Sequence, residues 1–325
     1  EENYDNADYS SEEEEEEQLS DEEKDFTEKA EKNKKVDSWD RYLIVSDLDG
    51  SLLNNKSDVS KFTCDTVKRI INNGHIFVII TGRPPKNALT IYKKLGLKHL
   101  MCNLNGAYIW NPADDKFVPV NLCFNSDVAV RILSSRKILK YVDNFVVENY
   151  KGTYMRYIPA PDKQSAEYSS FHIKPDQTVI QIGTNLTKLK NTDCYSVLLQ
   201  LKGKSKEDLN NLIFELRLFS KTLITRVWSD AILGYVVEVN SKFATKGTAL
   251  DYLSNYYSIP QENCIAFGDG DNDDEMLANA SYGYAMMNGS MTAKLAADYI
   301  TKYTNDEDGV ARALAHIKKV MGGDR

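Results

Sequence analysis

The chain has little cysteine or histidine, and what it has is scattered. Its five cysteines are odd in number and no two lie within three residues of each other, which argues against a disulfide scaffold and a zinc site. No two of the four histidines have the spacing of a metal-binding pair. This usage fits a reducing compartment, so we expect a cytoplasmic protein. The residues are Cys64, Cys102, Cys123, Cys194 and Cys264, and His75, His99, His172 and His316.

Long apolar runs are also missing. The longest stop near five residues, as at residues 76–80, whereas a membrane-spanning helix needs about 20 apolar residues. We therefore expect no membrane segment. With 325 residues, 42% of them hydrophobic and 27% charged, the composition is that of an ordinary globular protein with one large or two moderate domains.

Negative charge is concentrated at the amino end. Of the 48 acidic and 40 basic side chains, residues 1–40 hold 18 and 5, a net charge of −13, and residues 41–325 hold the remaining 30 and 35, a net charge of +5. Six consecutive glutamates at residues 12–17 repel one another and offer no apolar face, which predicts a disordered tail. Such a tail is either simply solvated or folds over the basic body as an autoinhibitory arm.

From residue 41 onward, strands and helices alternate. Apolar, β-branched runs predict strands that are buried on both faces of a sheet, and Asn73-Gly74 is a helix stop signal. The alternation predicts a parallel sheet and returns near the other end of the chain. The expected strands are residues 42–46, 76–80, 99–104 and 264–267, and the expected helices are residues 59–73, 84–95, 246–257, 273–280 and 310–320.

The middle of the chain has an α/β pattern of its own, long enough for an inserted domain. We therefore predict a Rossmann-like, doubly wound parallel sheet core with an inserted α/β cap domain. The predicted division is an acidic tail at 1–40, a first core part at 41–121, the cap at 122–238 and a second core part at 239–325. Within the cap we expect helices at 127–139 and 205–219 and strands at 145–148, 154–158, 195–201, 223–228 and 233–239.

Two aspartates follow the first predicted strand. Asp47 and Asp49 leave the strand two residues apart, so both side chains point to the same side at the carboxyl end of the sheet, where open α/β folds bind ligands. One carboxylate can attack while the other moves a proton. Two aspartates that merely cap a turn would look the same, so this motif is weak by itself.

Two further motifs lie where predicted strands meet predicted helices. Thr81 and Gly82 follow the second strand, and a hydroxyl with exposed backbone N–H groups at a helix start forms an anion site. Lys246 lies at the start of a helix, where its positive charge opposes the helix dipole. Taken singly, these residues are better explained as an ordinary turn and a surface lysine.

An acidic cluster follows the strand at residues 264–267. The segment GDGDNDD at residues 268–274 offers carboxylates without histidine or cysteine, which are hard ligands suited to Mg²⁺ or Ca²⁺. An EF-hand is excluded: counted from Asp269, the sixth loop residue is Asp274 instead of glycine and the twelfth is Ala280 instead of glutamate. A solvated acidic turn is the alternative, although its mutual repulsion is costly without a cation.

In this order, the motifs resemble those of the haloacid dehalogenase-like (HAD) phosphohydrolases, and within them the Cof-type sugar-phosphatase subfamily. DLDGSL at residues 47–52 resembles the family's DxDGTL, with Ser51 in place of threonine, and TGRP at 81–84 resembles its second motif. Lys246 followed by glycine resembles the third motif, and GDGDND at 268–273 the fourth. NGA at 105–107 is similar to a segment that Cof-type members carry before the cap.

The resemblance implies a mechanism. Asp47 would attack phosphorus to form an aspartyl-phosphate, and Asp49 would protonate the leaving alcohol and later activate water. Mg²⁺ would lie among the Asp47 and Asp269 carboxylates and the Asp49 backbone carbonyl, with Asp273 as a direct or water-mediated ligand. Lys246 would neutralise charge shared by Asp47 and the phosphoryl group. The residues implied to bind substrate or phosphate are Thr81, Gly82, Asn105, Gly106 and Asn272.

The implied function is a Mg²⁺-dependent phosphatase for small phosphomonoesters, above all sugar phosphates, without nucleic-acid or membrane partners. A phosphomutase of the same superfamily would use the same Asp47 but return the phosphoryl group to a sugar. A phosphorylatable receiver is shorter and lacks a large insertion, and a non-catalytic phosphate-binding or regulatory protein would not need the acidic and basic motifs intact. The sequence names neither the substrate, nor the cap residues that select it, nor the oligomeric state.

Overall fold

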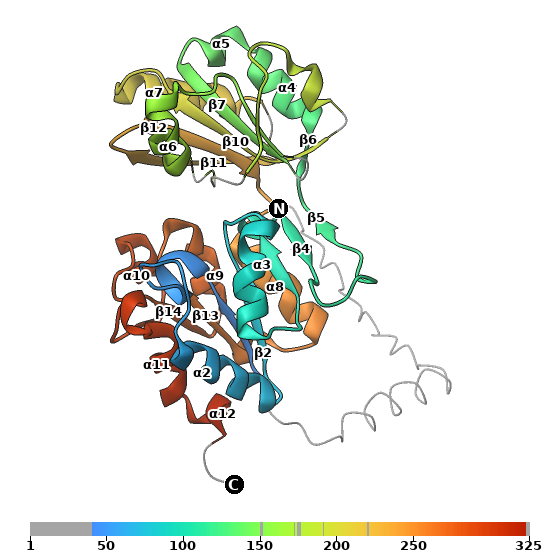
Figure 1. The fold of residues 1–325 in the computed structure, drawn as a ribbon, viewed down its shortest axis with the longest axis vertical. Coiled ribbons are helices and arrows are strands. Elements are labelled where there is room, and N and C mark those ends of the chain that lie inside the picture. Colours follow the sequence, from blue (N-terminus) through green and yellow to red (C-terminus); the bar gives the residue numbers. More distant parts are fainter. Residues whose placement is uncertain are drawn as a thin grey trace, which may run out of the picture. The chain divides into compact units, whose positions relative to one another are not determined.

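The structure is a computed structural model that describes residues 41–149, 152–171, 173, 177–190, 192–219 and 221–322. These residues form two β-sheets, each with its own helices (Figure 1). The predicted acidic tail at residues 1–40 lies outside the described residues. Among the described helices, none is long and apolar enough to cross a lipid bilayer.

The first sheet has eight strands in the order β15-β14-β13-β1-β2-β3-β4-β5. The six strands from β15 to β3 are parallel, and β4 and β5 add antiparallel pairs at one edge. β1 therefore lies in the middle of the sheet, between β2 and β13. The strands are β1 (Leu43–Ser46), β2 (Ile76–Ile80), β3 (Met101–Asn103), β4 (Tyr108–Trp110), β5 (Val120–Asn121), β13 (Cys264–Gly268), β14 (Tyr282–Ala285) and β15 (Tyr299–Ile300).

Helices cover both faces of this sheet, because its central strands are apolar on both sides. On β1, Ile44 packs into one core cluster while Leu43 and Val45 pack into the cluster on the opposite face. One face is covered by α2 (Lys61–Asn72), α3 (Pro85–Leu95), α11 (Gly309–His316) and α12 (Lys318–Met321). The other face is covered by α8 (Lys246–Tyr257), α9 (Asp274–Asn279) and α10 (Met291–Ala296). The predicted doubly wound α/β fold is confirmed.

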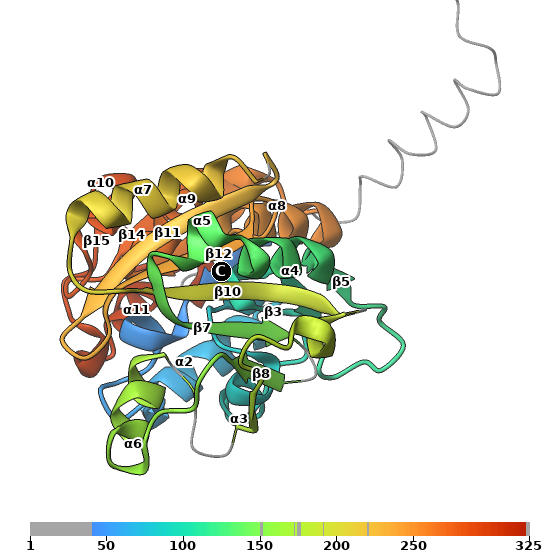
Figure 2. The ribbon, with the colours of Figure 1, turned by 90° about the horizontal axis from the view of Figure 1, so that it is seen from above.

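The second sheet is formed by the middle of the chain. Its strands follow the order β11-β12-β10-β7-β8-β9, with β6 also paired to β10, and Figure 2 shows β12, β10 and β7 side by side. Every described pair is antiparallel except β8 with β9. The strands are β6 (Phe124–Asn125), β7 (Val142–Asn149), β8 (Gly152–Met155), β9 (Val179–Gln181), β10 (Asp193–Leu201), β11 (Leu223–Asp230) and β12 (Gly234–Ser241).

Helices cover one face of this second sheet. Its apolar residues pack with buried side chains of α4 (Ser126–Ser134), α5 (Arg136–Leu139) and α7 (Lys206–Arg217). The opposite face carries a smaller apolar cluster and several polar side chains, and α6 (Pro161–Ser170) has no buried residue. The boundaries 122 and 238 stay a prediction, since the second sheet's pairing starts with β6 and ends with β12.

Several predicted elements differ from the observed ones. The expected helix at 127–139 is two helices, because Ser135 has an extended ψ of 114° and Ser134 Oγ donates to the Val130 carbonyl, a bond that bends helix ends. The last helix is likewise divided at Ile317, with ψ 92°. The short strands β4, β5, β6 and β9 and the surface helix α6 were not predicted, because too few residues carry each pattern.

The burial of α8 yields a stability prediction with a matched control. Leu250 on α8 is fully buried, whereas Leu295 on α10 is 80% exposed. We expect Leu250→Ala to lower the free energy of unfolding by about 2–5 kcal/mol and Leu295→Ala to change it by less than about 0.5 kcal/mol. Urea unfolding measures both, and equal effects would contradict the packing of α8 described here.

Candidate active site

The candidate site lies where the central parallel strands end. Asp47 directly follows β1, and its backbone N–H donates to the Phe267 carbonyl on β13 at 3.0 Å, so the ladder fixes its position. Asp269 directly follows β13, and Thr81 directly follows β2. Because the carboxyl ends of parallel strands share one edge of the sheet, residues far apart in the sequence meet here.

Lys246 is the central cation of this site. Its side chain is fully buried, and Nζ lies 2.9 Å from Asp47 Oδ1 and 2.6 Å from Asp273 Oδ1. The interpretation of Lys246 as a surface residue is therefore wrong. Thr245 begins α8 with a side chain that accepts a hydrogen bond from the Thr248 N–H, which sets where the helix starts. The two carboxylates compensate for a lysine at the positive end of a helix.

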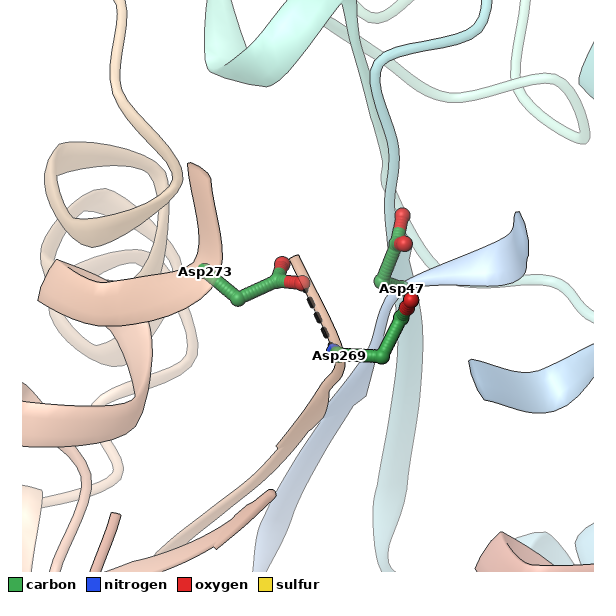
Figure 3. A group of neighbouring side chains, drawn as sticks. All are labelled: Asp47, Asp269 and Asp273. Carbon is green, nitrogen blue, oxygen red and sulfur yellow. Dashed lines mark hydrogen bonds between the residues drawn. The ribbon is translucent and has the colours of Figure 1, made fainter. Parts of the chain in front are cut away.

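Asp273 is held by the backbone of the loop that contains Asp269. Its Oδ2 accepts hydrogen bonds from the Asp269 N–H at 2.9 Å and from the Gly270 N–H at 2.8 Å. Ser51 Oγ donates to Asp269 Oδ1 at 2.8 Å, which orients that carboxylate. Figure 3 shows Asp47, Asp269 and Asp273 near the ends of the strands, with the hydrogen bond from the Asp269 N–H to Asp273 drawn as a dashed line.

These three aspartates form a group that could hold a metal ion. One carboxylate oxygen from each lies within 4.8 Å of the others. Asp47 and Asp273 are buried and Asp269 is half-buried. All three donors are hard carboxylate oxygens, the ligand type that Mg²⁺ and Ca²⁺ prefer.

Burial and mutual repulsion make the ionised carboxylates costly. Burial raises the pKa of Asp47 to about 8; Lys246 opposes this shift, and the charges of Asp273 and Asp269 add to it. Burial and the charge of Asp273 likewise raise the pKa of Asp269 to about 6. Burial alone would lower the pKa of Lys246, but Asp273 and Asp47 raise it, so this lysine stays charged. The cluster thus holds more negative charge than one lysine offsets, and a divalent cation would relieve the repulsion.

The residues expected to bind phosphate meet beside this cluster. Asn272 Nδ2 donates to Asn105 Oδ1 at 2.8 Å, across 167 positions of sequence. The Asn105 N–H donates to the Thr81 carbonyl at 3.0 Å, and Thr81 Oγ1 accepts from the Arg83 N–H at 3.1 Å. A Cβ on Gly82 would lie 3.3 Å from Asn105 Oδ1, so Gly82 and Asn105 are neighbours.

Gly106 serves close packing between two segments. Its φ is +91°, and a Cβ there would lie 2.6 Å from the Thr245 carbonyl oxygen and 2.9 Å from Ala249 Cβ. Only glycine fits without a shift of the backbone. Gly106 therefore lets the segment that carries Asn105 approach the start of α8, where Lys246 lies.

Asp49 lies apart from the acidic group. It is exposed, and its carboxylate makes a two-pronged ion pair with Arg83, one bond running from Nε to Oδ2 at 2.6 Å. Its side chain is not part of the three-aspartate group. The alternation of side chains along a strand predicted that Asp49 would point to the same side as Asp47, but the strand ends at Ser46 and the chain turns within Leu48–Leu52, where Gly50 has a φ of +73°.

Sequence reasoning missed the residues that hold the loops. In the sequence, Arg83 is only one residue of the TGRP motif at 81–84, whereas in the structure it pairs with Asp49. Asn288 Nδ2 donates to the Gly50 carbonyl at 2.8 Å, and Ser290 N–H donates to the Asp269 carbonyl at 2.7 Å. One signal was available: the segment from Met286 to Ser290 follows β14, another strand whose carboxyl end lies at this edge.

Comparison with known proteins identifies the family. The model of a protein family described as "haloacid dehalogenase-like hydrolase" matches residues 44–314, which is most of the chain. The chain belongs to the haloacid dehalogenase-like hydrolases. This HAD hydrolase is 32% identical over 273 residues to the 5-amino-6-(5-phospho-D-ribitylamino)uracil phosphatase YitU of Bacillus subtilis, covering 84% of this chain and 96% of that protein. It is 29% identical over 293 residues to the phosphatase YwpJ of the same organism, covering 85% and 99%.

A solved structure supports the same assignment. A haloacid dehalogenase-like hydrolase from Bacillus subtilis superposes with a TM-score of 0.68 at 27% identity, covering 85% of this chain and 99% of that one. The recognition of a Cof-type HAD protein from its motifs is therefore confirmed, and the chain is a phosphatase.

The buried position of Lys246 yields a prediction about folding that does not depend on catalysis. Lys246→Met keeps most of the side-chain volume but leaves Asp47 and Asp273 without their cation, so we expect a loss of about 3–5 kcal/mol in the free energy of unfolding. Adding Asp47→Asn to Lys246→Met should recover part of that loss. Urea unfolding in metal-free buffer decides: a loss below about 1 kcal/mol would show that the ion pairs are not as buried as described.

Proposed function

We propose that this phosphatase hydrolyses small phosphomonoesters, with sugar phosphates as the main class, through an aspartyl-phosphate on Asp47 and with Mg²⁺ as cofactor. The observation that carries the proposal is the buried ion pair between Lys246 and Asp47 beside Asp269 and Asp273. A carboxylate that is buried, oriented by a lysine and adjacent to a cation site is suited to attack an anionic phosphorus centre.

The proposed reaction has two displacements. In the first, an Asp47 carboxylate oxygen forms a bond to phosphorus, the bond between phosphorus and the ester oxygen breaks, and the departing alkoxide takes a proton from Asp49. In the second, water attacks phosphorus, Asp49 takes a proton from that water, and the bond to Asp47 breaks to give inorganic phosphate. Because the Arg83 guanidinium stabilises ionised Asp49, the Asp49 side chain must leave Arg83 to carry a proton.

The proposed cofactor site uses residues with matching chemistry. The Asp47, Asp269 and Asp273 carboxylates would hold Mg²⁺. The raised pKa values of Asp47 and Asp269, which reflect burial and repulsion among the carboxylates, agree with this assignment. When bound, the ion neutralises charge on the phosphoryl oxygens and on the carboxylates. The Asp49 backbone carbonyl is the remaining ligand that we propose from the sequence motif.

The remaining site residues bind and orient the phosphoryl group in this proposal. Thr81 and the Gly82 N–H bind its oxygens, and Asn272 orients it while bonded to Asn105. Lys246 offsets the charge shared by Asp47 and phosphate. Gly106 contributes by letting the Asn105 segment approach α8.

We also propose that residues 122–238 form a cap that encloses the substrate, between core parts at 41–121 and 239–325. Enclosure excludes bulk water and limits substrate size. The relative YitU is named for a small phosphomonoester, a phosphorylated ribityl chain joined to an aminouracil, which agrees with a substrate that a cap can enclose.

The central test removes the attacking charge. Asp47→Asn keeps shape and volume but cannot form the aspartyl-phosphate, so we expect phosphate release from a hexose phosphate to fall by several orders of magnitude. Asp65→Asn, at an exposed carboxylate paired with Lys61, serves as the control and should keep the wild-type rate. If Asp47→Asn retained more than about a hundredth of the wild-type kcat, the covalent scheme would be wrong.

The cofactor assignment predicts a difference between two neighbouring aspartates. Asp269→Asn should raise the Mg²⁺ concentration for half-maximal activity by at least about tenfold, because a ligand loses its charge. Asp271→Asn should shift it far less, since Asp271 accepts a hydrogen bond from Ser290 and lies outside the acidic group. Full wild-type turnover in excess chelator, or equal shifts for the two variants, would refute the metal site.

The cap predicts a size limit. We expect kcat/KM for a hexose phosphate to exceed that for a folded phosphoprotein by at least about a hundredfold, equivalent to about 2.7 kcal/mol of transition-state binding. Phosphate release from both substrates under the same conditions measures the ratio. Comparable values would mean that residues 122–238 do not enclose the substrate.

A further inference from the structure

A cavity of about 450 Å³ adjoins the loops that carry the proposed phosphate-binding residues. Pro84 and Leu104 line it; Pro84 comes two residues after Gly82, and Leu104 directly precedes Asn105. The Leu104 N–H donates to the Arg83 carbonyl at 3.3 Å, which ties the two loops together. The volume lies within the range of about 300–1,000 Å³ typical of small-molecule sites. A substrate with its phosphate near Asn105 can therefore extend into this cavity.

One part of the cavity wall is aromatic. Tyr108 and Trp110 come from β4 and Tyr195 from β10. The Tyr108 ring centroid lies 6.2 Å from that of Tyr195 at an interplanar angle of 65°, and 6.2 Å from that of Trp110 at 42°. Mutual contacts hold these rings, so they present flat, preformed apolar surfaces to a ligand.

Another part of the wall is polar and carries an acid that the proposed mechanism does not use. Glu148 on β7 lies opposite Thr153 on β8 and opposite Ser196 on β10, and Glu148 and Thr153 both line the cavity. Ser196 Oγ donates to Glu148 Oε2 at 3.0 Å, which orients the carboxyl group. Within the described part of the chain, Glu148 has no ion pair.

The setting of Glu148 is unusual for a structural acid. Burial raises the pKa of Glu148 to about 7; the Ser196 hydroxyl opposes this shift and the charge of Glu238 adds to it. Lys86 also lines the cavity, but Glu148 has no ion pair with it. A partly buried carboxyl group without an ion-pair partner costs free energy unless a ligand donates hydrogen bonds to it. Carboxylates in such positions accept from the N–H edges of heterocyclic rings, and aromatic side chains stack on the faces of the same rings.

We propose that this cavity binds a planar nitrogen heterocycle carried by the substrate, with ring N–H groups donating to Glu148 and a ring face packed on the aromatic wall. The proposal rests on the phosphatase function proposed above and narrows its substrate class. The preferred substrates are phosphorylated sugars or polyols joined to a nitrogen heterocycle, and simple sugar phosphates leave this cavity unfilled.

Two matched substrate pairs test the proposal on the full chain with Mg²⁺. Ribose phosphate and uridine monophosphate, whose base has a ring N–H, differ by the base, and ribitol phosphate and flavin mononucleotide differ by the flavin ring. We expect kcat/KM to be higher for the ring-bearing member by about tenfold or more in at least one pair, as stacking of one ring supplies. If the ring gives no advantage in either pair, the proposal is overturned.

A pair of variants tests the role of Glu148. Glu148→Gln keeps the side-chain shape but removes the charged acceptor, so the preference for the ring-bearing substrate should fall by about tenfold. Glu207→Gln is the control, since Glu207 lies on α7, is exposed and does not line the cavity. It should keep the wild-type preference. Equal falls in the two variants, or an unchanged preference in Glu148→Gln, would contradict the assignment.

The outcomes distinguish the proposed phosphatase function from the proposed heterocycle site. If the wild-type chain releases phosphate from both members of each pair at similar rates, and Asp47→Asn does not, the phosphatase proposal stands and the heterocycle site falls. If Asp47→Asn releases phosphate as fast as the wild type, the proposed function itself falls, whatever the preference between substrates. Matching thermal unfolding midpoints for the wild type, Glu148→Gln and Glu207→Gln exclude misfolding as the cause of a change.

Discussion

The site depends on one interaction, the buried contact of Lys246 with Asp47 and Asp273. A buried lysine is costly by itself, and so is a buried carboxylate, and each is retained here because of the other. Lys246 fixes where α8 must begin relative to the ends of β1 and β13. The close approach at Gly106, the capping of α8 by Thr245 and the loop bonds to Asp273 all serve that arrangement.

The parallel sheet supplies the second constraint. β1 lies between β2 and β13, so three strands from distant parts of the chain end at one edge and deliver Asp47, Thr81 and Asp269 to one place. The loops beyond those ends are then bonded to one another, as in the contact of Asn272 with Asn105. The scaffold therefore sets the positions of Asp47, Thr81 and Asp269 before any ligand binds, and such preorganisation is the condition for electrostatic catalysis.

Much of this arrangement could be predicted from the sequence because its signals are local. A few consecutive residues carry each signal. Examples are the buried runs at β1, β2 and β13, the helix stop at Asn73-Gly74 and the helix start at Lys246. The motifs that carry the family resemblance lie at the ends of those strands. Their order along the chain was enough to recognise the family.

What the sequence could not predict depends on contacts between distant segments. The pairing of Asp49 with Arg83, the bond from Asn288 to Gly50 and the edge strands β4 and β5 arise only once the sheet is assembled. The same holds for Glu148, whose neighbours Ser196 and Thr153 come from two other strands. A single glutamate in a strand gives no local signal of a ligand site.

The most direct test of the central claim is the stereochemical course at phosphorus. A phosphorothioate monoester made chiral by oxygen isotopes would be hydrolysed in isotopically labelled water, and the configuration of the released thiophosphate determined. Attack by Asp47 followed by attack by water inverts phosphorus twice, so the account predicts overall retention. Net inversion would mean that water attacks the substrate directly, and would contradict the role assigned to Asp47.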